Sequence, residues 1–115
     1  MKIKTITKEI EVYKVDGKEF ESYSDAKEYV VENFYENNLE KHRDYLFGWD
    51  LFKCNTKDEF EMVKYHNQIY SYVFDVKFDY KKENYPIRCI HTSSGEVYSI
   101  GEKLYEGLIE FNKEK

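Results

Sequence analysis

The chain has 115 residues, of which 41% are apolar and 36% are charged, and its formal net charge is −5. This length and apolar content predict one folded domain over residues 1–115 and exclude a disordered chain. No apolar run approaches the ~20 residues that cross a bilayer, and no secretory signal is recognisable at the start, so we expect a cytoplasmic protein that does not associate with membranes.

The first predicted element is a β-hairpin over residues 9–21. Apolar and polar residues alternate in its first arm, and Asp16-Gly17 provides residues that tolerate the positive φ angles of a tight turn. The returning arm covers 18–21, where we expect Phe20 to point inward.

Two helices are predicted in the middle of the chain. A capping-box-like start at Ser22 is followed by apolar residues at helical spacing, which predicts one long or kinked helix over 22–47. The segment 49–54 is apolar enough for a buried strand or an extended connection, and its pattern does not decide between them. A second cap at Thr56 predicts a shorter helix after it.

The C-terminal part predicts an antiparallel sheet of about four strands. Its clearest strand covers 70–80, and two hairpin arms over 87–92 and 96–100 and a last strand over 108–111 follow. The strand over 70–80 alternates polar residues with Tyr70, Tyr72, Phe74, Val76, Phe78 and Tyr80. We interpret this face as core, because burying six such side chains contributes ~10 kcal/mol. At its two ends Tyr70 and Tyr80 are expected to stay partly exposed, and a platform for stacking bases is the less favoured alternative. The predicted fold class is α+β.

Two segments resemble known proteins: VYKVDGKEFESYSDAKEY at 12–29 and GEVYSIGEK at 95–103. The first resembles a hairpin-plus-helix opening found in small accessory proteins of bacteriophages and other mobile elements. That resemblance implies a phage accessory protein, and many such proteins inhibit host defence stoichiometrically, as anti-CRISPR proteins do. The order of elements also looks broadly like viral sponges that sequester cyclic nucleotide signals. Neither resemblance assigns a binding residue.

No catalytic or metal centre is indicated by the sequence. Cys54, Cys89, His66 and His91 lack the close pairs that zinc ligands form, and we interpret both cysteines as reduced and buried. Neither cysteine lies in the electropositive surroundings that activate a thiolate nucleophile. The sequence therefore predicts a protein that is not an enzyme and uses no metal or cofactor.

Acidic side chains outnumber basic ones more than two to one between residues 9 and 50. Glu28, Glu32, Glu36 and Glu40 stand four apart, so a continuous helix would place them on one acidic ridge. Such a chain, with two arginines, is a poor candidate for binding nucleic acid and better suited to a basic protein surface. An ordinary solvated helix face is the alternative interpretation.

Three functions are weighed on this basis. The first is a non-enzymatic inhibitor that binds a basic surface of a host defence protein through the acidic ridge. The second is an oligomeric sponge for a cyclic nucleotide, for instance a homodimer, in which Arg88 binds phosphate and Trp49 or Tyr98 stacks on the base. The third is a structural or assembly protein of the phage particle.

Overall fold

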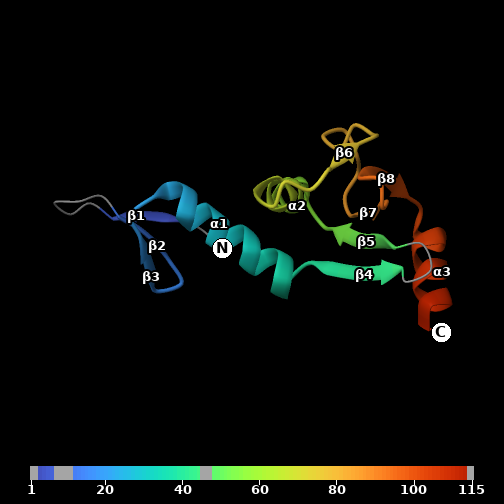
Figure 1. Cartoon of the computed structure of the whole chain (residues 1–115), viewed down its shortest axis with the longest axis horizontal. Coiled ribbons are helices and arrows are strands. Elements are labelled where there is room, and N and C mark those ends of the chain that lie inside the picture. Colours follow the sequence, from blue (N-terminus) through green and yellow to red (C-terminus); the bar gives the residue numbers. More distant parts are fainter. Residues whose placement is uncertain (1–2, 7–11, 45–47, 114–115) are drawn as a thin grey trace. The chain divides into compact units, whose positions relative to one another are not determined.

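The computed structural model describes residues 3–6, 12–44 and 48–113. The chain divides into two compact units, Met1–Asn38 and Leu39–Lys115, and each is described by itself (Figure 1). The described residues form helices and two separate sheets, so the predicted α+β class is confirmed. The single domain stays a prediction.

The first unit contains a three-stranded antiparallel sheet and one helix. Its strands are β1 (Lys4–Ile6), β2 (Val12–Val15) and β3 (Lys18–Phe20), in the order β1-β2-β3. Asp16 and Gly17 both have positive φ, 49° and 82°, which is the backbone of the tight hairpin turn that the sequence predicts. The predicted hairpin is confirmed over 12–20, and residues 9–11 lie outside the described part.

The helix α1 covers Tyr23–Asn37. Ser22 is its N-cap and accepts a hydrogen bond from the backbone N–H of Asp25 at 3.5 Å, as the capping pattern predicts. Ala26 is fully buried, and α1 contacts β2 and β3.

The prediction of a single helix over 22–47 is wrong. The helix ends at Asn37, and Glu40–Asp44 forms the strand β4, while residues 45–47 lie outside the described part. Asn37 and Asn38 favour a helix end, since asparagine side chains compete for backbone hydrogen bonds. The backbone of β4 instead pairs with the strand that begins at Trp49.

The second unit contains a five-stranded sheet in the order β4-β5-β7-β8-β6. Its strands are β4 (Glu40–Asp44), β5 (Trp49–Cys54), β6 (Asp75–Val76), β7 (Ile87–His91) and β8 (Glu96–Ile100). Neighbours are antiparallel except β6 and β8, which are parallel. The predicted hairpin arms are confirmed as β7 and β8, and 49–54 is a strand.

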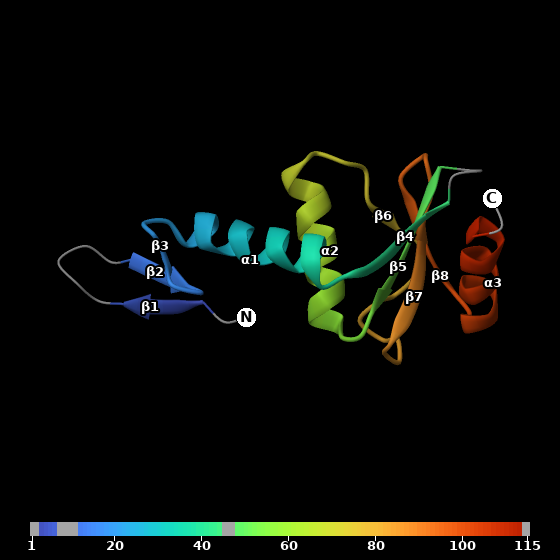
Figure 2. The ribbon, with the colours of Figure 1, turned by 90° about the horizontal axis from the view of Figure 1, so that it is seen from below.

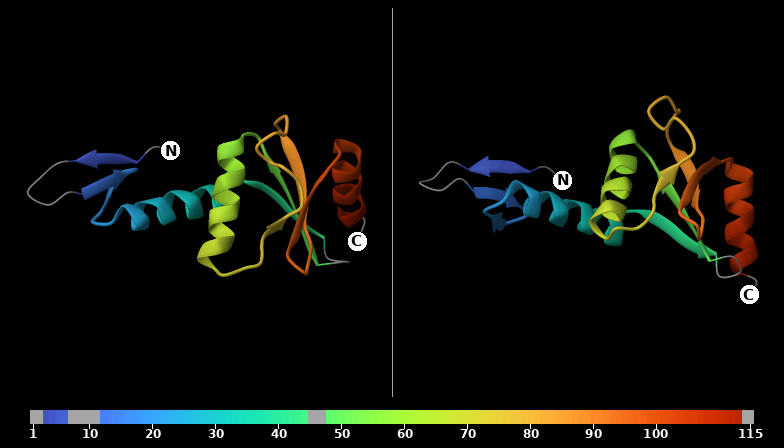
Figure 3. Two further views of the ribbon diagram at one scale, coloured as in Figure 1. Left: turned by 90° about the horizontal axis from the view of Figure 1, so that it is seen from above. Right: turned by 45° about the horizontal axis from the view of Figure 1, so that its top comes forward.

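Two helices cover opposite faces of this sheet (Figures 2 and 3). They are α2 (Lys57–Ile69) and α3 (Glu102–Lys113). The predicted second cap is confirmed, because Thr56 Oγ1 accepts the backbone N–H of Glu59 at 3.2 Å. Within the described ranges, no helix is long and apolar enough to span a membrane.

The two sheet faces carry separate parts of the core. On the α3 side, Leu51 and Ile90 are paired across β5 and β7 and pack with Tyr105 of α3. On the other side, Phe52 of β5 contacts Phe60 of α2, with ring centroids 6.3 Å apart. Successive side chains of a strand point to opposite faces of the sheet, so β5 packs against α2 with one face and against α3 with the other.

Two predicted strands are wrong. Over 70–80 only β6 is a strand. The helix α2 continues to Ile69, and only Asp75 and Val76 of the following segment pair with β8. The predicted strand over 108–111 lies inside α3, where Tyr105, Leu108 and Ile109 lie on the side that packs on the sheet.

Candidate functional site

The acidic ridge is formed by Glu28, Glu32 and Glu36 on α1. These residues lie on successive turns of one continuous helix, with Glu36 exposed and the other two half-buried. Glu40 does not belong to the ridge: it lies in β4 of the other unit, where its Oε2 accepts a hydrogen bond from the Tyr105 hydroxyl at 2.8 Å. The ridge therefore has three carboxylates and not four.

The two end turns of α1 add no positive charge to the acidic ridge. The last turn of α1 has no basic residue, and Asp25 adds an acidic one to the first turn. Within the part of the chain that the structure describes, Glu28 and Glu36 make no ion pair. Like charges four residues apart on a helix repel by a few tenths of a kcal/mol, a cost that a cationic partner would relieve.

A second acidic row occurs on α3, and sequence reasoning misses it because it predicts a strand over 108–111 and no helix over 102–113. Glu102, Glu106 and Glu110 have the same spacing of four residues. This row is partly compensated: Arg88 Nη2 lies 3.9 Å from Glu102 Oε1, and Lys113 Nζ lies 3.6 Å from Glu110 Oε1. The α3 row thus matches the acidic ridge in spacing and differs from it in pairing.

The three residues predicted for nucleotide binding, Trp49, Arg88 and Tyr98, lie on the α3 side of the sheet. Trp49 packs against the core beneath α3. The side chain of Arg88 is 18% exposed and faces Glu102, and the Tyr98 hydroxyl donates to Glu96 Oε2 at 2.9 Å. Each has a structural role in the fold, and their ligand role stays a prediction.

The cysteines and histidines are distributed through the second unit. Cys54 and Cys89 are fully buried in β5 and β7. Burial raises the pKa of the Cys54 thiol to about 12, and it raises the pKa of the Cys89 thiol above its usual value. His66 is buried on α2, while His91 Nε2 forms a hydrogen bond with the carbonyl oxygen of Val73 at 2.8 Å. Among the described residues, no group of three or more metal-binding side chains comes together.

The predicted aromatic face of 70–80 divides into two parts. Tyr70 and Tyr72 are 46% and 61% exposed and stack on each other. The partial exposure expected of Tyr70 is therefore confirmed, and the core interpretation is wrong for Tyr72. Tyr80 is 9% exposed and stacks on Phe60, with centroids 4.5 Å apart, so it belongs to the core and the partial exposure expected of it is wrong. The sequence shows only the alternation, and the path of the backbone decides which rings are covered.

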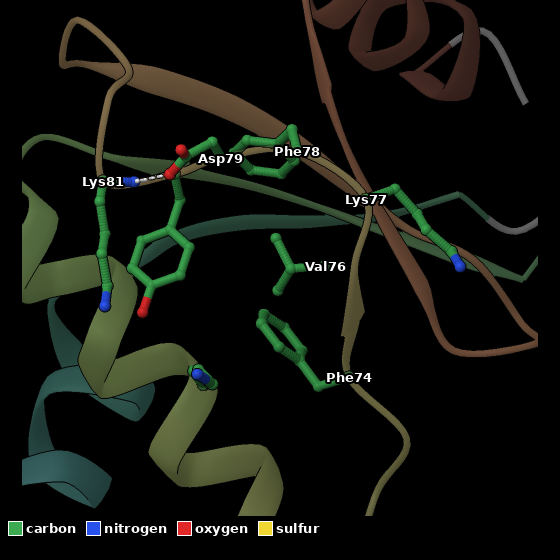
Figure 4. Close-up of a pocket in the computed structure, with 8 residues that line it drawn as sticks. Phe74, Val76, Lys77, Phe78, Asp79 and Lys81 are labelled. Carbon is green, nitrogen blue, oxygen red and sulfur yellow. Dashed lines mark hydrogen bonds between the residues drawn. The ribbon is translucent and has the colours of Figure 1, made fainter.

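The second half of this face lines an open pocket of about 820 Å³, which we call the aromatic pocket. Its lining residues are Lys64, Phe74, Val76, Lys77, Phe78, Asp79, Tyr80 and Lys81. Figure 4 shows Phe74, Val76 and Phe78 pointing to one side of the chain and Lys77 pointing to the other. Sequence reasoning did not find this site, because Lys64 comes from α2 and carries no local signal.

No protein-family model, curated protein or solved structure matches this chain.

Proposed function

We propose that this protein is a non-enzymatic binding protein whose acidic ridge docks on a basic protein surface. The observation that supports the proposal best is a row of three carboxylates on one continuous helix, two of which make no ion pair among the described residues. A helix rises 1.5 Å per residue, so the row extends for ~12 Å. A row of lysine and arginine side chains is its natural complement.

The class of partner we propose is a host defence protein that handles nucleic acid. Surfaces that bind phosphates present lysine and arginine, and a row of carboxylates competes for the same cations. The resemblance of residues 12–29 to phage accessory proteins supports this choice. The complex would weaken as salt rises, since exposed charges are screened over ~8 Å at physiological ionic strength.

A phage-infection assay tests the proposal. The chain is expressed in bacteria that carry a CRISPR nuclease, with a panel of nuclease types, and plaques of a targeted phage are counted. We expect the native chain to restore plaques against at least one type. The triple variant Glu28→Lys, Glu32→Lys, Glu36→Lys should lose this effect while circular dichroism shows its helix content unchanged.

The α3 row provides the matched control. The variant Glu102→Lys, Glu106→Lys, Glu110→Lys makes the same charge change at the same spacing, and it should still restore plaques. Equal protection by both triple variants would remove the acidic ridge from the mechanism. No protection by the native chain against any member of the panel would remove the proposed partner class.

A further inference from the structure

We infer that the aromatic pocket binds a small aromatic anion, with the size and chemistry of a nucleoside monophosphate. Its planar ring would pack against Phe74 and Phe78, and its anionic group would lie between Lys64 and Lys81. This inference is independent of the proposed function, because all of these residues belong to the unit Leu39–Lys115 and none to α1.

The apolar wall of the pocket is held by Phe60. This ring is fully buried on α2 and has its centroid 5.8 Å from that of Phe74, 5.7 Å from that of Phe78 and 4.5 Å from that of Tyr80. Phe74 and Phe78 remain half-buried after this packing, so part of each ring faces the pocket. A ligand ring would contact a preformed surface, so its binding would not carry the entropy cost of ordering these side chains.

Two ammonium groups lie beside the same wall. Lys64 Nζ is 5.6 Å and Lys81 Nζ is 5.9 Å from the centroid of the Tyr80 ring. Within the described part of the chain neither lysine makes an ion pair. Two cations without carboxylate partners next to an apolar surface favour a ligand that is both flat and negatively charged.

The remaining charges near the pocket already have partners. Lys77 points away from the aromatic side chains (Figure 4), and its Nζ lies 2.7 Å from Asp75 Oδ2. Asp79 accepts the backbone N–H of Lys81 at 3.3 Å and lies 3.8 Å from the Lys82 ammonium group, and Glu61 accepts the Tyr80 hydroxyl at 2.6 Å. Lys64 and Lys81 are therefore the charges left for a ligand.

The volume and the chemistry of the pocket define the ligand class. About 820 Å³ lies within the range of ~300–1,000 Å³ that small-molecule sites occupy. Inorganic phosphate would satisfy the lysines and leave the rings exposed, while a neutral nucleoside would do the reverse. Only a molecule that combines a ring with an anionic group contacts both the aromatic side chains and the two lysines.

Titration calorimetry and thermal unfolding with four probes test the inference: adenosine monophosphate, indole-3-acetate, adenosine and inorganic phosphate. We expect one or both aromatic anions to bind, and at about 100 times Kd to raise the melting temperature by at least ~4 °C, whereas adenosine and phosphate bind at least ~10-fold more weakly. A response to the first probe alone identifies a phosphate ester, and a response to the second alone identifies a carboxylate. No response to either overturns the inference.

Two double variants locate the binding. Lys64→Gln with Lys81→Gln should lower the affinity for the aromatic anion at least ~10-fold. The control Lys57→Gln with Lys103→Gln removes two exposed lysines that are not pocket residues, and it should leave affinity unchanged. Equal affinity in both double variants would show that the anion binds elsewhere and would overturn the assignment.

Discussion

The Tyr105 hydroxyl donates a hydrogen bond to Glu40 Oε2 at 2.8 Å and so joins α3 to β4, 65 residues apart in the sequence. Tyr105 is fully buried, and its burial, together with this bond, raises the pKa of its hydroxyl above the usual value of a tyrosine. The bond fixes the last helix to the first strand of the same sheet.

Removing that hydroxyl should destabilise the second unit measurably. Tyr105→Phe keeps the ring and loses the hydrogen bond, and we expect a fall of ~1 kcal/mol in the free energy of unfolding. Tyr105→Ala also opens a cavity and should cost ~3–5 kcal/mol. Urea unfolding followed by circular dichroism measures both values. The control is Tyr98→Phe, which loses an exposed hydrogen bond to Glu96 and should change stability less.

Gly95 should not tolerate a side chain. Its φ is +95°, and an added Cβ would lie 2.5 Å from Val73 Cβ and 3.1 Å from the Val73 carbonyl oxygen. Gly95→Ala is therefore expected to lower the free energy of unfolding by ~1–3 kcal/mol. Gly101→Ala, at a position with open space around it, should stay within ~0.5 kcal/mol of the native protein. Equal urea midpoints for the two variants would contradict this.

Both thiols should be inert in the folded protein. Cys54 and Cys89 are fully buried, and burial keeps their thiols protonated by raising the pKa of each. The thiolate is the reacting form, so Ellman's reagent at pH 8 should label neither cysteine of the native chain within minutes. In 6 M guanidinium we expect two thiols per chain to react at once. Rapid labelling of the native protein would show that these strands open easily.

Stability should fall in alkaline solution. The hydrogen bond to Glu61 raises the pKa of Tyr80 to about 12, and burial raises that of Tyr85 to about 12. An unfolded tyrosine ionises near ~10, so the folded state favours the neutral hydroxyls. Their contribution is complete below pH ~10 and is lost as pH rises from ~10 through 12.

Urea midpoints measured at pH 7, 9, 10 and 11 check this pH dependence. The two tyrosines should leave the midpoint unchanged up to pH 9 and lower it above pH 10. The buried thiols of Cys54 and Cys89 add a decline that begins near pH ~9 and is the same in the native chain and in Tyr80→Phe. Tyr80→Phe removes one of the two hydroxyls, and its decline should be shallower than that of the native chain. Parallel declines in the two proteins would exclude Tyr80 as a source.

The elements that the sequence predicts correctly have strong local signals. The turn at Asp16-Gly17 needs positive φ angles, which aspartate and glycine accept readily, and the cap at Thr56 satisfies a free backbone N–H whatever else the chain does. The hairpin arms β7 and β8 are separated by a short turn that contains Gly95 at a positive φ of 95°. In each case, neighbours in the sequence are enough to determine the conformation.

The elements that the sequence misses depend on distant partners. β4 has the sequence EKHRD, and it becomes a strand because its backbone pairs with β5. The sequence predicts a strand over 108–111, inside α3, although Tyr105, Leu108 and Ile109 have helical spacing.

The candidate sites follow the same rule. The spacing of Glu28, Glu32 and Glu36 predicts a ridge wherever the helix is continuous, and it fails at Glu40 where the helix has ended. The aromatic pocket needs Lys64 and Lys81 beside one ring, and only the packing of the 74–81 segment on α2 brings them there. Local sequence patterns do not predict contacts between residues on separate elements.

The composition of β4 has a consequence for how the protein behaves in concentrated solution. β4 is at one end of the strand order, so one side of its backbone is not paired within the sheet. Every residue in it is charged or is histidine. A strand from another copy that joined this border would come close to that row of polar and charged side chains, which opposes open-ended stacking and fibre growth. The same charged residues that give β4 no strand-like sequence pattern therefore disfavour pairing of this edge with a second copy.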